Sequence, residues 1–182
     1  MVKVRLYLVR HGKTMFNTIG RAQGWSDTPL TAEGERGIQE LGIGLRESGL
    51  QFDRAYSSDS GRTIQTMGII LEELGLQGKI PYRMDKRIRE WCFGSFDGAY
   101  DGDLFMGIIP RIFNVDHVHQ LSYAELAEGL VEVDTAGWAE GWEKLSGRIK
   151  EGFEAIAKEM EEQGGGNALV VSHGMTIGTI VY

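Results

Sequence analysis

The chain has 182 residues, of which 42% are hydrophobic and 25% charged, and its formal net charge is −7. This length and composition fit one α/β domain with a substantial core, and they exclude a disordered or fibrous chain. The acidic balance argues against a nucleic-acid partner, since nucleic-acid-binding proteins carry a surplus of Lys and Arg.

The first predicted element is a buried strand over 2–9, rich in Val, Leu and Tyr. It ends abruptly at Arg10-His11-Gly12, which is typical of a strand that runs into a functional turn. After a loop, Thr31 is a plausible N-cap for a helix with apolar spacing, and Gly49 a plausible stop.

The middle of the chain predicts a second strand over 52–57, a helix over 60–74 and a weaker third strand over 79–84. The stretch 95–136 is rich in glycine and shows no clear period. We interpret it as an inserted cap, called the cap segment below, rather than as a regular layer of the fold.

Apolar residues recur at helical spacing over 138–162, and three glycines at 164–166 end that helix. A buried strand over 167–171 then leads into Ser172-His173-Gly174. Strands that alternate with helices predict a three-layer αβα sandwich, with helices on both faces of a mostly parallel sheet.

Two predicted strands, one near each end of the chain, terminate in the same chemistry: LVRHG at 8–12 and VVSHG at 170–174. Ligands of open α/β sheets bind at the carboxyl ends of strands, so both imidazoles would face one crevice if the strands are neighbours. A glycine after each histidine lets backbone N–H groups approach an anion closely. One such histidine is more often structural, but two in matching contexts favour a site.

Five motifs in order extend this pattern: LVRHGKTMFN, QGWSDTPLTAEG, AYSSDSGRTIQT, IREWCFGSFDG and VVSHG. Together they resemble the histidine phosphatase superfamily, also called the phosphoglycerate mutase-like family. The resemblance covers nearly the whole chain apart from the cap segment. It implies a phosphoglycerate mutase-like fold with a small cap, a small-molecule phosphate ester as substrate, and no metal or cofactor.

The resemblance also implies roles for individual residues. His11 would be the nucleophile that forms a phosphohistidine, and Glu90 would protonate the leaving oxygen and then activate water. The phosphoryl oxygens would be held by Arg10, Arg62, His173 and Asn17, with Gly174 beside them. Gln23 and Arg21 would contact the rest of the substrate.

Several of these residues have ordinary structural alternatives. Arg62 could form a surface ion pair, Glu90 could balance the charges of Lys86, Arg87 and Arg89, and Asn17 could cap a turn. His117 and His119, two residues apart, suggest a pair of metal ligands, but they lack further ligands at characteristic spacing. Asp101-Gly102-Asp103 is equally weak as a magnesium site. We therefore predict no metal.

The same phosphohistidine chemistry can end in hydrolysis or in transfer of the phosphoryl group within a mutase. The modest cap and the motifs QGWSDTPLT and REWCFGSFDG are more similar to the bacterial phosphatase branch, so hydrolysis is predicted, with mutase activity second. A third alternative is a protein that binds a phosphate ligand without turnover. Each of these three functions is compatible with a homo-oligomer of the chain.

Other features bear on the setting of the protein. A single cysteine, Cys92, excludes an internal disulfide framework, and the N-terminal apolar stretch is too short for a signal peptide. No apolar run approaches the roughly 18 residues of a membrane span. We expect a cytoplasmic single domain over 1–182, without a membrane partner, and lacking a C-terminal segment because the chain stops nine residues after His173.

Overall fold

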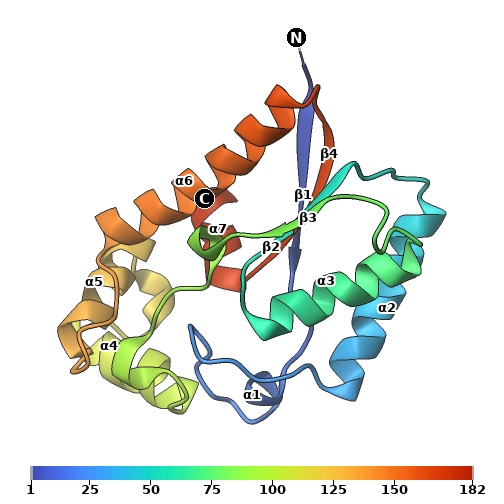
Figure 1. Ribbon diagram of the computed structural model, residues 1–182. Helices are drawn as coiled ribbons and strands as arrows, with labels where there is room; N and C mark the ends of the chain where they lie inside the picture. Colours follow the sequence, from blue (N-terminus) through green and yellow to red (C-terminus); the bar gives the residue numbers. More distant parts are fainter. Residues whose placement is uncertain (1, 182) are drawn as a thin grey trace.

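The computed structural model describes residues 2–181, and a parallel sheet lies at its centre (Figure 1). The four strands are β1 (Val4–Arg10), β2 (Arg54–Ser57), β3 (Tyr82–Met84) and β4 (Gly166–Ser172). Their spatial order is β1-β4-β2-β3, and every neighbouring pair is parallel. The first and last strands of the sequence are therefore adjacent in space.

Helices cover both faces of this sheet, which confirms the predicted three layers (Figure 1). One face packs against α2 (Ala32–Glu47) and α3 (Gly61–Glu73), and the other against α6 (Trp142–Glu162) and α7 (Gly174–Val181). Alternate residues of each strand point to opposite faces. In β4, Leu169 packs on the α2–α3 side and Val170 on the α6 side.

Local signals place the helix ends. Thr31 is the N-cap of α2, where its hydroxyl accepts a hydrogen bond from the Gly34 amide at 3.0 Å. Gly49 follows the end of α2 with φ +72°, a conformation that glycine adopts at no steric cost. Both signals confirm the predicted helix. Near the first strand, the short α1 (Met15–Thr18) begins at a capping box formed by Thr14 and Asn17.

The cap segment contains more regular structure than its composition suggested. Five short helical elements lie at or within its limits: η2 (Gly94–Phe96), the π-helix η3 (Asp103–Ile108), α4 (Ile109–Ile112), η4 (Val118–Gln120) and α5 (Tyr123–Val133). Here α5 starts at a capping box of Ser122 and Glu125 and buries Leu126 and Leu130. A further 3-10 turn, η1 (Lys86–Ile88), follows β3.

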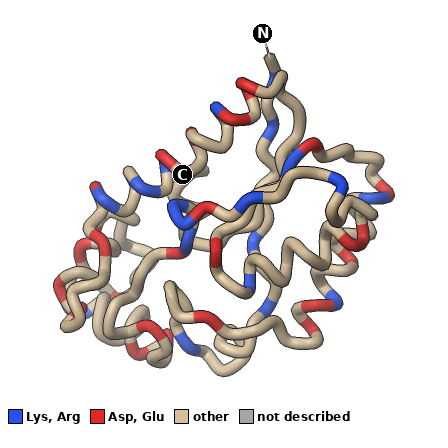
Figure 2. The backbone as a smooth tube through the Cα atoms, in the orientation of Figure 1, with Lys and Arg blue, Asp and Glu red and all other residues tan. Residues whose placement is uncertain are grey.

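Charged residues of both signs are spread along the chain rather than sorted onto one face (Figure 2). On α6, basic and acidic side chains alternate, and the pairs Lys150–Glu154 and Lys158–Glu162 lie within 4 Å of each other. Across residues 2–181, no helix is both long and apolar enough to cross a membrane.

Candidate active site

The pairing of β1 with β4 brings the two His-Gly turns together. Arg10 lies opposite Ser172 in the register, so His11 and His173 both follow the last paired residue of their strands. The His11 amide donates to the Ser172 carbonyl at 3.1 Å, and the centroids of the two imidazole rings are 5.3 Å apart. The two imidazoles thus meet at the carboxyl edge of the sheet, as the sequence predicted.

The ring of His11 is held in one tautomer. Its Nδ1 lies 2.8 Å from the carbonyl oxygen of Gly12, and because a carbonyl only accepts, Nδ1 carries the proton. The other ring nitrogen, Nε2, therefore keeps its lone pair. Burial, followed by the charge of Arg62, lowers the pKa of His11 to about 4. At neutral pH this imidazole is uncharged and can act as a nucleophile.

His173 is buried and uses both ring nitrogens within the protein. Arg62 donates from Nη2 to Nδ1 at 3.0 Å, so the proton is on Nε2, which donates to the Ser58 hydroxyl at 2.7 Å. Burial and the nearby Arg62 hold the pKa of His173 well below its ordinary value. His173 thus orients Arg62, while its contact with a phosphoryl oxygen stays a prediction.

Arg62, near the start of α3, is fully buried, so a surface ion pair does not describe it. Its Nη1 donates to Asp27 Oδ1 and to the Ser26 carbonyl, both at 2.9 Å, and its Nη2 donates to the Gly24 carbonyl at 2.8 Å. Its Nε is buried, and no partner for it lies among residues 2–181. A buried donor without a partner costs free energy, so this N–H is suited to an anionic ligand.

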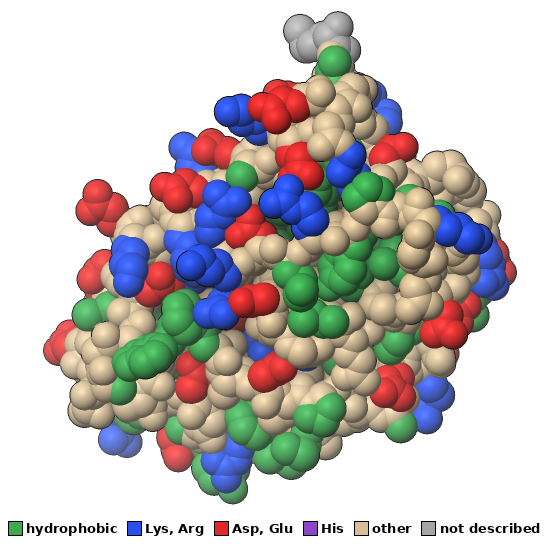
Figure 3. All heavy atoms as spheres, in the orientation of Figure 1, with side chains coloured by type: hydrophobic (Ala, Val, Ile, Leu, Met, Phe, Trp, Pro, Cys, Tyr) green, Lys and Arg blue, Asp and Glu red, His purple; other side chains and the backbone are tan. Residues whose placement is uncertain are grey.

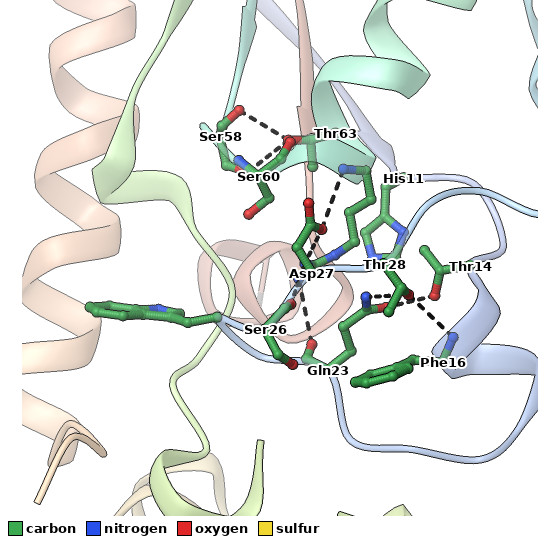
Figure 4. Close-up of polar contacts among 12 residues, drawn as sticks. His11, Thr14, Phe16, Gln23, Ser26, Asp27, Thr28, Ser58, Ser60 and Thr63 are labelled. Carbon is green, nitrogen blue, oxygen red and sulfur yellow. Dashed lines mark hydrogen bonds and ion pairs between the residues drawn. The ribbon is translucent and has the colours of Figure 1, made fainter. Parts of the chain in front are cut away.

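The carbonyls that surround Arg62 are held by a second carboxylate, Asp97. It accepts hydrogen bonds from the amides of Gly24, Trp25 and Ser26 at 2.8 to 3.3 Å. Figure 4 shows Gln23, Ser26 and Asp27 facing Ser58, Ser60 and Thr63, with His11 beside them. Sequence reasoning missed Asp97, Asp27 and Ser58. Two of the motifs contained the aspartates, but only the fold reveals their partners.

Glu90 is 6% exposed, which rules out a solvated surface role. Its Oε1 accepts from the Thr176 amide at 3.0 Å, and its Oε2 accepts from the Met175 amide at 3.2 Å, both in the first turn of α7. Burial raises the pKa of Glu90, although the backbone hydrogen bonds of Trp91 and Met175 oppose the rise. The neighbouring Arg87 and Arg89 pair with other carboxylates, Asp85 and Asp59.

The backbone of Glu90 is fixed from a third direction by α6. Arg148 donates to the carbonyls of Arg87 and Glu90 at 2.8 and 3.4 Å, and it pairs with the buried carboxylate of Glu140 at 2.6 Å. The indole of Trp25 also donates to the Glu90 carbonyl, at 2.9 Å. These contacts hold the Glu90 carboxyl against α7.

A polar cavity of about 400 Å³ lies beside His11 and is lined by Arg10, His11, Lys13, Asn17 and Asp101. Three predicted site residues thus meet in one space. Asn17 also caps α1, because its Oδ1 accepts from the Thr14 amide at 3.1 Å, so both interpretations of this residue hold. Sequence reasoning did not identify Lys13 and considered Asp101 only as a metal ligand.

The structure places the other predicted substrate residues around this cavity rather than in its lining. Gln23 is buried, and its amide group bonds to the hydroxyls of Thr14 and Thr28 at 2.6 and 2.8 Å. Arg21 stacks on Tyr100, with 4.4 Å from its Cζ to the ring centroid. Gly174 lies close to Arg10, since a Cβ built on it would be 3.5 Å from Nε. Their substrate contacts stay predictions.

Nothing among residues 2–181 resembles a metal centre. No group of three or more His, Cys, Asp or Glu side chains comes close enough to hold an ion within that range. Of the two histidines in the cap segment, His119 lines a separate cavity whose other lining residues are mostly apolar. The cavity at the sheet edge is instead lined by one arginine, one lysine, one asparagine, one aspartate and the uncharged imidazole of His11, while Arg62, Glu90 and His173 lie outside its lining.

The depressed pKa of His11 predicts a pH dependence of folding. Between about pH 6.5 and pH 4 the unfolded chain binds a proton that folded His11 does not, so the free energy of unfolding falls as the pH falls through this window. The shift of the His11 pKa from 6.5 to about 4 corresponds to a difference of about 3 kcal/mol in the free energy of unfolding. This contribution is fully present above pH 6.5 and is lost as the pH falls to about 4. Urea unfolding at several pH values measures the slope.

The matched variants for this measurement are His11→Gln and His117→Gln. The first should flatten the slope, because it removes one buried histidine and leaves His173, while the second should keep the slope of the unmodified protein. Equal slopes for all three proteins would show that His11 titrates normally in the folded state.

Comparison with known proteins assigns the chain to a family. A crystal structure of phosphoglycerate mutase from Bacillus anthracis superimposes with a TM-score of 0.91 and 38% identity, over 99% of this chain and 79% of that one. The Salmonella choleraesuis protein named "Probable phosphoglycerate mutase GpmB" is 33% identical over 180 residues, 98% of this chain and 73% of that protein.

A solved Escherichia coli protein with the provisional name alpha-ribazole-5′-P phosphatase is 25% identical, with a TM-score of 0.68, over 96% of this chain and 76% of that one. The relatives thus carry the names of both mutases and phosphatases. The family model of the histidine phosphatase superfamily (branch 1) matches residues 6–182. With its histidines paired at the edge of the sheet, the chain belongs to the histidine phosphatase superfamily, whose members are phosphoryl-transfer enzymes.

Proposed function

We propose that this protein hydrolyses a small phosphate monoester through a phosphohistidine formed on His11. The observation that carries the proposal is the state of the His11 ring: Nδ1 is bound to the Gly12 carbonyl, and Nε2 keeps its lone pair at neutral pH. Arg10 lines the polar cavity together with His11, and Arg62 lowers the pKa of His11 and has a buried Nε–H with no partner among residues 2–181. Cationic donors next to a nucleophile suit phosphoryl transfer.

The first half of the reaction moves the phosphoryl group to the enzyme. Nε2 of His11 attacks phosphorus, an N–P bond forms, and the bond from phosphorus to the ester oxygen breaks. Glu90 gives its proton to that oxygen, so the alcohol leaves neutral. The raised pKa of Glu90 supports this role, because a protonated carboxyl is then more populated than in water.

The second half returns the enzyme to its starting state. Glu90, now a carboxylate, takes a proton from water while the water oxygen attacks phosphorus. The N–P bond breaks, inorganic phosphate leaves, and His11 is again an uncharged imidazole. Arg10 and the Nε–H of Arg62 offset the negative charge on the phosphoryl oxygens in both steps.

The test compares the acceptor of the phosphoryl group. The protein is incubated with p-nitrophenyl phosphate and with 3-phosphoglycerate, with and without 2,3-bisphosphoglycerate. Release of phosphate without isomerisation supports hydrolysis. Isomerisation that depends on the bisphosphate would overturn it in favour of a mutase, which the names of the Bacillus and Salmonella relatives make the second candidate. Binding of phosphate with no release from any ester at any pH would leave only a binding protein.

Substitution of Glu90 by glutamine should separate esters by their leaving groups. The amide cannot supply a proton, so an alkyl phosphate should lose roughly 10²- to 10⁴-fold in kcat, whereas p-nitrophenyl phosphate should lose far less because its phenolate leaves unassisted. Steady-state kinetics on both esters measures the two losses. Glu154→Gln, on the surface of α6, is the matched control. Equal losses on both esters in Glu90→Gln would remove Glu90 from the acid role.

A further inference from the structure

A second cavity, of about 500 Å³, lies between the cap segment and α7. Most of its lining is apolar: Phe105, Val118, Leu121, Tyr123, Leu126 and Met175. Among the described residues that line it, there is no Lys, Arg, Asp or Glu. Figure 3 shows hydrophobic side chains gathered on the cap side of the molecule, whereas charged ones crowd the neighbouring surface over α6. Its chemistry is thus opposite to that of the polar cavity beside His11.

The start of α7 connects the two cavities. Gly174 packs against the side chain of Arg10, which lines the polar cavity, and the next residue, Met175, lines the apolar one. The Met175 amide donates to Oε2 of Glu90 at 3.2 Å. The wall of the apolar cavity is therefore in direct contact with the proposed acid.

The cap segment connects the cavities a second time. Asp101 lines the polar cavity, and Phe105, four residues later, lines the apolar one. Phe105 packs against Phe93 with ring centroids 5.5 Å apart, and Tyr123 packs against Trp91 with centroids 5.4 Å apart. The apolar cavity thus rests on the same short segment, 90–93, that begins with Glu90.

We propose that the apolar cavity is the subsite for the alcohol portion of the substrate, and that this portion is an uncharged alkyl or aromatic group. This assignment rests on the proposed function, in which Glu90 meets the ester oxygen. An ester with its phosphoryl group at His11 and its oxygen at Glu90 has its organic part next to the wall that Met175 forms. A second phosphate or a carboxylate would find no Lys or Arg among the described residues of that lining, whose polar side chains are His119, Ser122 and Tyr123.

Alkylphosphonates of increasing length test the subsite by equilibrium binding. They present a phosphate-like head that cannot be hydrolysed, while the apolar tail varies. Titration calorimetry with methyl-, butyl- and hexylphosphonate should show the dissociation constant falling about fourfold for each added methylene, which is the effect expected from burying one CH₂. Dissociation constants independent of chain length would overturn the proposal.

Variants locate the effect. Val118→Gln and Met106→Gln each place an amide in the apolar lining. In both variants the dissociation constant should become nearly independent of the length of the alkyl chain. Met106 is 79% exposed, so its substitution does not threaten the fold. The matched control is Val131→Gln on α5, a residue outside the cavity lining that is 40% exposed, which should leave every constant unchanged.

Two other outcomes are decisive. If the dissociation constant still falls with each methylene in both lining variants, as in the unmodified protein, the tail binds elsewhere and the assignment is overturned. A loss of self-association in Val118→Gln, with an unchanged gain per methylene, would instead assign the cavity to a second copy of the chain. If no ester releases phosphate, the proposed hydrolysis fails, whereas the phosphonate series still reports on the subsite.

Discussion

Replacing His11 with alanine should lower kcat by about four to six orders of magnitude and abolish formation of the phosphoenzyme. Alanine has no lone pair to offer phosphorus, and the donors that remain can only polarise an ester for direct attack by water. The fold should survive, because among residues 2–181 the imidazole hydrogen-bonds only to the adjacent Gly12 carbonyl. Phosphate release and the intact mass of enzyme quenched during turnover measure the two losses.

The control for this variant is His117→Ala, which removes an exposed histidine from the cap segment. It should keep the activity and the phosphoenzyme signal of the unmodified protein. Wild-type turnover in His11→Ala would refute the assignment of the nucleophile, and with it the proposed mechanism. A phosphoenzyme that persists in His11→Ala would move the covalent step to another residue.

The second large effect is expected from Arg62→Lys. Lysine keeps the charge, but it cannot donate to Asp27, the Gly24 carbonyl and His173 from one planar group while keeping a further N–H for the anion. We expect a loss of about 10²- to 10³-fold in kcat/KM, typical of a missing oxyanion donor. Unfolding should become easier by about 3 kcal/mol, because a buried charge loses its hydrogen bonds.

Arg46→Lys provides the comparison, since Arg46 pairs with Glu73 at the surface. Exposed pairs of this kind contribute about 0 to 1 kcal/mol, so both activity and stability should stay close to those of the unmodified protein. Urea unfolding and kinetics on one ester, measured in parallel, separate the two consequences of the Arg62 change. If Arg62→Lys retained full activity, the unpartnered Nε would not be part of the anion site.

The sequence predicted the sheet edge of the site because that edge depends on local signals. The apolar runs before Arg10 and before Ser172 could only be buried strands, and a parallel sheet places their carboxyl ends on one side. It could not reveal the surroundings of Arg62. Those depend on the carbonyls of a loop 36 to 38 residues before Arg62 and on Asp97, which lies 73 residues from Gly24 of that loop, and no period or spacing encodes such contacts.

The cap segment was harder to read for a different reason. Its helices are short, and a π-helical stretch occupies the middle of the helical run over 101–112, so hydrophobic periodicity had little length over which to appear. The capping box of Ser122 and Glu125 was present in the sequence, but it precedes a helix of only 11 residues. What orders this segment is packing, such as that of Phe105 on Phe93 and of Tyr123 on Trp91.

The position of Glu90 at the first turn of α7 has a consequence for the order of events. When the carboxyl releases its proton, the new negative charge appears where the amides of Met175 and Thr176 already point. Under the proposed mechanism, the N-terminal end of α7 therefore offsets the charge of the deprotonated acid through amides that are already in place. Glu90 would then lose and regain its proton in each cycle with the same two amide partners.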